Sequence, residues 1–279
     1  MSDIAIACCQ VAPRIGDPEG NRARAEAAVE AAAGEGAAVV VLPELMSSGY
    51  VFADAEEARR LAEPVVGGPT VSSWAQLSRS YGLVIVGGAC ELDGDGAVRN
   101  SAVLIDRGSV GAVYRKAHLW DREGIFFRPG SETPPVVETS VGRIGVMVCY
   151  DLEFPEWVRL AALQGAELIC SPVNWPAVPR PPGERPGELV RLQAAAATNR
   201  MFIAACDRVG SERGIDWIGG SVIVDPDGWP LAGPAPPGEA VTLIAHCRLA
   251  DARDKRLSAR NDVLADRRPE LYGALAEGA

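Results

Sequence analysis

Histidine is nearly absent from this chain, which has only two histidines, His118 and His246, in 279 residues. The seven cysteines are an odd number, and they show neither Cys-x-x-Cys spacing nor interleaved histidines. These features argue against a zinc site and against a disulfide framework. Six of the cysteines lie in short apolar segments typical of strands: Cys8, Cys9, Cys90, Cys170, Cys206 and Cys247. We therefore expect buried thiols in a reducing compartment, with the cytoplasm as the default location.

Long apolar runs and a basic N-terminal segment are also lacking. No uninterrupted apolar stretch approaches the roughly 20 residues that span a bilayer, and no basic region precedes an apolar block at the N-terminus. The formal net charge is −10, and basic residues are scattered until the C-terminal tail. We therefore expect no membrane span, no signal peptide and no nucleic acid as a general partner.

Strand and helix signals alternate along the chain. The predicted strands are short and nearly all apolar, and they span residues 4–11, 37–42, 83–90, 101–106, 109–115, 144–148, 167–170, 201–206, 220–224 and 240–247. The predicted helices span 21–33, 70–81 with Thr70 as the N-cap, a segment from Pro155, and 189–199. This alternation is typical of an α/β fold, in which helices cover the faces of sheets. The Pro-rich loop 172–186 could pass for a linker, but the same rhythm continues after it, so we expect residues 1–279 to form a single domain.

The segment 144–156 contains a candidate nucleophile. Its first five residues predict a buried strand, and Pro155 fits the first turn of a following helix. Cys149 falls at the turn between the two, where a helix N-terminus would favour the thiolate. A free cysteine at the end of an apolar strand is, however, most often a buried small hydrophobe. The rest of the chain has to decide between these interpretations.

Ionisable residues follow three predicted strands: Glu44, Lys116 and Cys149. Ligands bind at the carboxyl ends of strands in α/β sheets, so these side chains could share one site. A thiol that attacks an amide or nitrile carbon must lose a proton, which a carboxylate can accept. A lysine ammonium and a backbone N–H can then stabilise the oxyanion. The three residue types together favour a cysteine hydrolase.

Simpler explanations exist for each residue alone. Glu44 could cap a helix, Lys116 could be a solvated edge lysine, and Cys149 could be a core thiol. A Cys–His pair is the usual alternative mechanism, and His118, in a loop two residues after Lys116, is the competing base. His246 lies inside the last predicted strand, where we expect a buried core histidine.

Three motifs in this order resemble those of the nitrilase superfamily of carbon–nitrogen hydrolases, and the resemblance covers nearly the whole chain. Residues 42–45 (LPEL) resemble the glutamate motif of that family, residues 114–119 (YRKAHL) its lysine motif, and residues 148–156 (VCYDLEFPE) its cysteine motif. The second glutamate of the family follows the lysine within one loop, and Glu123 stands where it is expected.

The resemblance implies a mechanism. Glu44 would be the base, Lys116 the oxyanion stabiliser and Cys149 the nucleophile. Glu123 would be a supporting carboxylate, and the backbone N–H of Tyr150 would complete the oxyanion hole.

The resemblance also implies an architecture. The fold would be a four-layer α-β-β-α sandwich, with neither a metal nor an organic cofactor. The protein would form a homodimer or a larger homo-oligomer, and the tail 251–279 would contribute to subunit contacts.

The sequence constrains the type of bond that is cleaved less than it constrains the catalytic residues. Family branches that carry an aromatic–Asp pair after the cysteine, as Tyr150 and Asp151 do here, are often amidases or carbamoylases, whereas nitrilases often carry Trp-Glu. We therefore expect hydrolysis of a small amide, with a nitrile or an N-carbamoyl compound as alternative substrates. The loops 46–52, 120–127 and 174–182 would shape an apolar pocket. Their candidate substrate-binding residues are Tyr50, Trp120, Phe127, Asn174 and Trp175.

Two further function classes are compatible with the same fold. Cys149 could pass an acyl group to an amine, although the chain lacks the membrane helices of the membrane-bound acyltransferases of the family. A non-catalytic binding protein is disfavoured, because Glu44, Lys116 and Cys149 are all intact.

Overall fold

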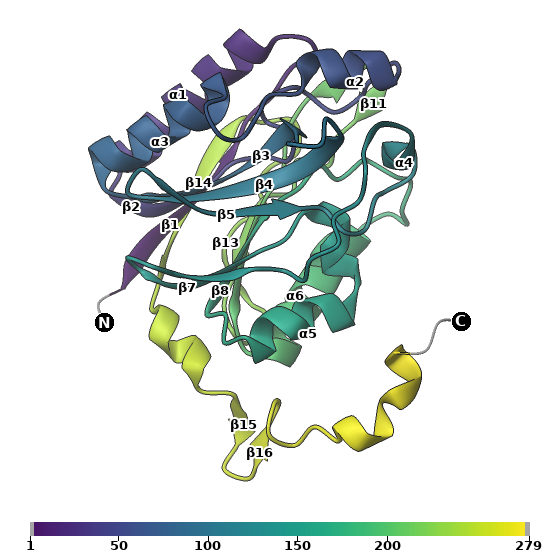
Figure 1. The fold of residues 1–279 in the computed structure, drawn as a ribbon. Coiled ribbons are helices and arrows are strands. Elements are labelled where there is room, and N and C mark those ends of the chain that lie inside the picture. Colours follow the sequence, from purple (N-terminus) through teal and green to yellow (C-terminus); the bar gives the residue numbers. More distant parts are fainter. Residues whose placement is uncertain (1–2, 277–279) are drawn as a thin grey trace.

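Two six-stranded sheets pack face to face in the computed structural model, which describes residues 3–276 (Figure 1). The first sheet has the order β14-β1-β2-β3-β4-β5, with β1 (Ile4–Gln10), β2 (Ala37–Val41), β3 (Val84–Leu92), β4 (Val98–Asp106), β5 (Ser109–Arg115) and β14 (Val241–Cys247). The second has the order β13-β12-β9-β8-β7-β6, with β6 (Val136–Thr139), β7 (Gly142–Val146), β8 (Leu168–Pro172), β9 (Phe202–Cys206), β12 (Val222–Val224) and β13 (Pro230–Ala232).

Helices cover the outer face of each sheet (Figure 1). Helices α1 (Pro18–Gly34) and α3 (Pro69–Tyr81) pack on the first sheet, while α5 (Pro155–Leu163) and α6 (Gly187–Asn199) pack on the second. The four layers are therefore helix, sheet, sheet and helix, which confirms the predicted α/β sandwich.

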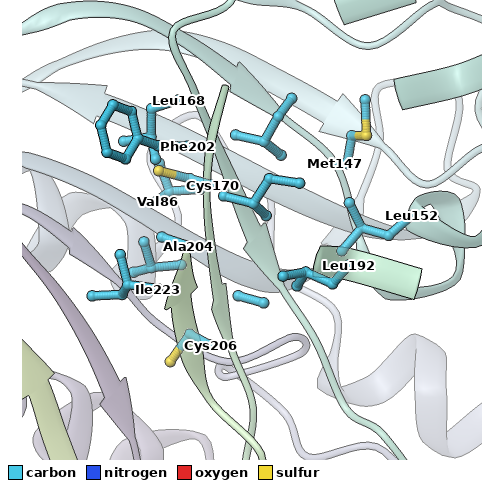
Figure 2. Packing of buried hydrophobic residues seen from close by; sticks show 14 of the residues in the cluster. Val86, Met147, Leu152, Leu168, Cys170, Leu192, Phe202, Ala204, Cys206 and Ile223 are labelled. Atoms are coloured by element: carbon cyan, nitrogen blue, oxygen red, sulfur yellow. The ribbon is translucent and has the colours of Figure 1, made fainter. Parts of the chain in front are cut away.

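The core between the sheets explains why the strands are apolar along their whole length. Val39 of β2 and Val86 of β3 belong to the same buried cluster as Cys170 of β8 and Ala204 of β9. Figure 2 shows Val86 among side chains of the second sheet, including Leu168 and Cys170. The alternate residues of the same strands face the helices. Neither face of these strands therefore meets solvent, and the usual alternation of polar and apolar residues disappears.

Strand direction brings three strand ends to one edge of the sandwich. Strands β1, β2 and β3 are parallel, as are β7, β8 and β9. Strand β5 is antiparallel to β4, which is antiparallel to β3, so two reversals point β5 the same way as β2. Glu44 follows β2, Lys116 follows β5 and Cys149 follows β7, which places all three beyond carboxyl ends.

Several local features differ from the sequence-based expectations. Thr70 is not the N-cap of α3, because Pro69 already occupies the first turn and Gly68 precedes it. His246 is exposed rather than buried, since Ala245 and Cys247 take the inward positions of edge strand β14. The short helices α2 (Ala55–Leu61) and α4 (Glu123–Phe126) and strand β6 were not predicted, because four to seven residues carry little periodic signal.

The C-terminal segment leaves the sandwich after β14 (Figure 1). It forms a 3-10 turn at Leu249–Arg253, the two-stranded β15 (Arg256–Ser258) and β16 (Asn261–Asp262), and two further turns up to Ala276. Residues 277–279 of the predicted tail, like residues 1 and 2 of the predicted domain, lie outside the described residues. No helix within residues 3–276 is long and apolar enough to cross a membrane.

Candidate active site

Lys116 lies between two carboxylates at the buried edge of the sandwich. Its Nζ is 2.9 Å from Oε1 of Glu44 and 2.8 Å from Oε1 of Glu123, and all three side chains are at most 3% exposed. Asn100 of β4 donates to Oε1 of Glu44 at 2.7 Å, and the hydroxyl of Tyr50 donates to Oε1 of Glu123 at 2.6 Å. Lys116 is therefore fixed by ion pairs on two sides.

Close backbone approach fixes Glu44. A Cβ atom built on Gly88, in the middle of β3, would lie 2.5 Å from the Cα of Glu44, so only glycine lets the segment after β2 approach β3 this closely. On the other side, Nδ2 of Asn174, which follows β8, donates to the carbonyl of Glu44 at 3.0 Å. Residues of both sheets thus hold the carboxylate in place.

Cys149 adopts a left-handed backbone conformation, with φ at 46°. It begins a 3-10 turn, Cys149–Glu153, that separates β7 from α5. Such a conformation in a residue other than glycine costs free energy and is concentrated at functional sites. The Sγ atom lies 3.8 Å from the carbonyl oxygen of Asn174. The turn thus directs the thiol toward the loop that also holds Glu44.

Burial dominates the protonation states of the cluster. It raises the pKa of Glu44 to about 7; Glu123 adds to this effect and Lys116 opposes it. Burial alone would lower the pKa of Lys116, but the charges of Glu123 and Glu44 outweigh it and the pKa lies well above its usual value. For Cys149, burial and the charge of Glu44 raise the thiol pKa well above its usual value, although Lys116 opposes them.

The helix N-terminus that was expected to favour the thiolate of Cys149 does not lower the thiol pKa overall. The 3-10 turn separates the sulfur from the start of α5 at Pro155, and desolvation outweighs the favourable charge of Lys116. The resting site holds a neutral thiol beside a carboxyl group that exchanges its proton near neutral pH. Attack by this thiol requires a base.

Two adjoining cavities open beside the thiol. The smaller, about 130 Å³, is lined by Cys149 and contains Asn174 and Trp175 in its wall. The larger, about 540 Å³, is mainly apolar, and its lining includes Tyr50 and Phe127. Both cavities share Trp120, Tyr150, Pro176 and Val178. The structure thus brings all five sequence-predicted substrate-binding residues to the walls of these two cavities.

Other lining residues were missed by the sequence reasoning. Ile215 and Trp217 come from the hairpin β10 (Ser211–Glu212) and β11 (Ile215–Asp216) and the segment after it, too short to be predicted as strands. The smaller cavity also has a charged wall, in which Arg191 of α6 pairs with Glu153 and Glu188. Asn100 was overlooked because it precedes the predicted strand 101–106 and lies between Arg99 and Ser101, so nothing in the local pattern marks it out.

His118 does not join the carboxylate–lysine cluster. Its Nδ1 lies 2.7 Å from Oδ1 of Asp151, and its ring stacks on Phe154 with centroids 3.8 Å apart. The charges that act on the Cys149 thiol come from Glu44, Lys116 and Glu123. Within residues 3–276, no group of three or more His, Cys, Asp or Glu side chains is arranged to hold a metal ion.

Comparison with known proteins agrees with this arrangement. Residues 5–257 match the sequence profile of the carbon-nitrogen hydrolase family. A nitrilase of Pyrococcus abyssi is 37% identical over 272 residues, covering 96% of this chain and 99% of its own length. An N-carbamoylputrescine amidase of Solanum tuberosum is 34% identical, covering 93% of this chain and 90% of its own.

Solved structures show the same likeness. The crystal structure of an amidase from Nesterenkonia sp. superposes with a TM-score of 0.80 at 30% identity, covering 98% of this chain and 97% of that chain. A variant of that amidase has been solved with acrylamide added to its active-site cysteine. The chain described here therefore belongs to the carbon-nitrogen hydrolase family of the nitrilase superfamily, and it is a cysteine-dependent hydrolase of the amidase and nitrilase type.

Proposed function

We propose that the protein hydrolyses the C–N bond of a small amide to a carboxylic acid and ammonia through a thioester on Cys149. The observation that carries the proposal is a neutral, buried thiol beside a carboxyl group whose pKa is raised to about 7 and a lysine held between two carboxylates. This set supplies a nucleophile, a base matched to neutral pH and a fixed positive charge.

The first half-reaction forms the thioester. Glu44 accepts the thiol proton while Sγ attacks the carbonyl carbon, and the oxyanion is stabilised by the ammonium of Lys116 and the N–H of Tyr150. The adduct collapses as Glu44 returns the proton to the departing nitrogen, which releases ammonia. Atom Oε2 of Glu44 is buried and accepts no hydrogen bond from any protein group within residues 3–276, which leaves it free for these transfers.

The second half-reaction releases the acid. Glu44 now accepts a proton from water, the hydroxyl attacks the thioester carbon, and the thiolate leaves and is reprotonated by Glu44. Glu123 remains an ion-pair partner of Lys116 throughout, and its Oε2 accepts the N–H of Trp120 at 3.0 Å. Glu123 therefore supports the lysine and the cavity wall while the proton passes through Glu44.

The larger cavity supports an amide with an apolar group. Phe52, Phe126 and Trp217 are among its lining residues, and a cavity of about 540 Å³ falls within the range of small-molecule sites. A nitrile would pass first through a thioimidate, whose nitrogen also needs a proton from Glu44. The nitrilase alternative thus uses the same residues and differs in the substrate alone.

The charged wall of the smaller cavity favours an N-carbamoyl compound as the second candidate substrate. Glu153 and Glu188 each retain 18% exposure of the side chain and share one partner, Arg191. Two carboxylates and one guanidinium can bind the charged far end of a substrate whose carbamoyl group reaches Cys149. One relative, the Solanum tuberosum enzyme, bears the name N-carbamoylputrescine amidase.

Ammonia release from matched substrates tests the proposal. The panel contains an amide, a nitrile and an N-carbamoyl amine built on the same carbon skeleton, each assayed with the wild type and Cys149→Ala. We expect the amide to have the highest kcat/KM, with no turnover by the variant. A nitrile preference without amide turnover would replace the substrate assignment, and turnover by Cys149→Ala would refute the mechanism. Ammonia release that depends on an added amine would indicate acyl transfer.

We also propose that residues 1–279 form one domain and that the chain associates with a second copy through the tail and α5. The tail contacts the sandwich through a hydrogen bond from Arg159 of α5 to the carbonyl of Val263 and then extends past it in Figure 1. Leu257, Leu271 and Leu275 are each more than 60% exposed on it. Leu163 at the end of α5 is 45% exposed. Apolar side chains that project in this way are typical of association surfaces. Light scattering should give a dimer or a larger assembly for the full chain and a smaller species for a chain that ends at residue 255.

A reducing compartment such as the cytoplasm suits the thiols. All seven cysteines are free and buried. The nucleophile needs its thiol, and oxidation of Cys149 would stop the reaction. Loss of ammonia release on mild oxidation, reversed by dithiothreitol, would support this placement.

A further inference from the structure

Asp151 is fully buried, two residues after the nucleophile Cys149, but it lines neither cavity. Its Oδ2 accepts hydrogen bonds from the N–H of Val148 at 3.2 Å and from the hydroxyl of Tyr114 at 2.8 Å. Its Oδ1 accepts the N–H of His118 at 3.0 Å and faces Nδ1 of the same residue at 2.7 Å. A carboxylate has about four acceptor positions and can only accept, so a carboxylate at Asp151 with these four partners would place the proton of His118 on Nδ1.

The donors come from two segments that each carry a catalytic group. Val148 and Asp151 flank Cys149 in the turn after β7, and Tyr114 and His118 flank Lys116 at the end of β5. The two segments come from different sheets. Within the described residues, this one carboxylate is therefore bonded to the chain on both sides of the lysine as well as to the residue before the cysteine.

Aromatic packing fixes the donors themselves. The hydroxyl of Tyr114 also accepts Nε1–H of Trp157 at 2.9 Å. The ring of His118 stacks on Phe154 with centroids 3.8 Å apart, and it packs at 90° to the ring of Trp157 with centroids 4.9 Å apart. These contacts restrict the donors to one geometry, so the position of Asp151 is determined by rigid neighbours.

We propose that Asp151 is a positioning residue that sets the placement of the Cys149 sulfur relative to the Lys116 ammonium, and that His118 acts through it as an Nδ1 donor. The backbone of Cys149 is held in the left-handed region, with φ at 46°, and the side chain of Asp151 closes that turn onto the N–H of Val148. The proposal rests on the proposed roles of Cys149 and Lys116. It assigns His118 a structural bond in place of base catalysis.

Asp151→Asn tests the carboxylate. One oxygen becomes an NH₂ group that faces donors, so half of the four bonds are lost. Misplacement of a reacting group by about 1 Å costs about 10²-fold, so we expect kcat to fall about 100-fold with KM nearly unchanged. The rate of Cys149 alkylation by iodoacetamide should also change, and this readout needs no substrate. Asp93→Asn is the matched control, because Asp93 is a buried carboxylate with three donors in the β3–β4 turn.

His118 variants provide a second arm if Asp151→Asn does not fold. The Nδ2 of asparagine can replace Nδ1 of histidine as a donor, so His118→Asn should retain most of kcat while His118→Leu loses about tenfold or more. Equal losses in both variants would overturn the positioning role and restore His118 as a base. A wild-type kcat and alkylation rate in Asp151→Asn, or equal losses in Asp93→Asn, would also overturn the inference. Absence of activity in the wild type on every substrate would count against the proposed function alone, because the alkylation comparison would still decide the role of Asp151.

Discussion

Replacement of Glu44 by glutamine gives the most direct test of the base. Glutamine keeps the shape of the side chain and its contact with Asn100, but it cannot accept a proton. Loss of a general base costs about 10²–10⁴-fold in rate, so kcat/KM should fall by that factor. The residual rate should also lose its dependence on pH at the acid side, because the group that titrates there has been removed.

The position of that acid limb follows from the burial of Glu44. Its pKa is raised to about 7, above the usual value for a glutamate, so the protonated and inactive form accumulates as the pH falls below 7. About nine-tenths of the enzyme is active at pH 8 and slightly less than one-tenth at pH 6, so kcat/KM should drop about tenfold between them. A glutamate with an ordinary pKa would give almost no change over that range.

Ammonia release at low substrate concentration, measured from pH 5 to pH 9, gives the profile of the free enzyme. Glu167→Gln is a suitable control, because Glu167 is a buried carboxylate that pairs with Arg253 at the amino end of β8, opposite the site. An acid limb near pH 4.5, or a limb near pH 7 that survives in Glu44→Gln, would refute this reasoning. In the second case another group would be the base.

Four further substitutions separate catalysis from stability. Lys116→Met should lower kcat and kcat/KM together by about 10²–10³-fold. Because Lys116 lowers the pKa of Glu44, the same substitution should move the acid limb of the pH profile above pH 7, and an unmoved limb would contradict this. After brief mixing with substrate, intact-mass analysis should show an acyl adduct on the wild type and none on Cys149→Ala. Cys206→Ser should lower the free energy of unfolding by denaturant by about 1–3 kcal/mol and leave kcat unchanged. Gly88→Ala should lower stability by about 1–3 kcal/mol and kcat with it, because the new methyl group meets the backbone of Glu44; wild-type values in both assays would show that the strands can separate.

The alternation of strands and helices was sufficient to predict an α/β fold, and the resemblance to the nitrilase superfamily added the four-layer sandwich. Glu44, Lys116 and Cys149 could be read as neighbours because each follows a strand, and strand direction brings those ends to one edge. This argument needs only periodicity and the rule for strand ends. The roles assigned to these residues remain predictions for the experiments above.

The protonation states could not be predicted in the same way. They depend on how deeply both sheets bury the cluster, and burial results from contacts among segments far apart in the chain. The same limit applies to Asn100 of β4, which lies 56 residues from Glu44 and donates a hydrogen bond to it across β3, and to the hairpin that carries Ile215. The local sequence pattern does not predict contacts between segments so far apart in the chain.

The pair Tyr150–Asp151 shows how a sequence argument and a structure can agree on residues while differing on cause. The pair was used to favour an amide over a nitrile because family branches with an aromatic–Asp pair are often amidases, and that argument gave no physical reason for the preference. Tyr150 lines both cavities, but Asp151 is fully buried and bonded to Val148, Tyr114 and His118. The structure therefore leaves direct contact with a substrate to Tyr150 and the aromatic loops. Our proposal gives Asp151 a role through the placement of Cys149 and Lys116.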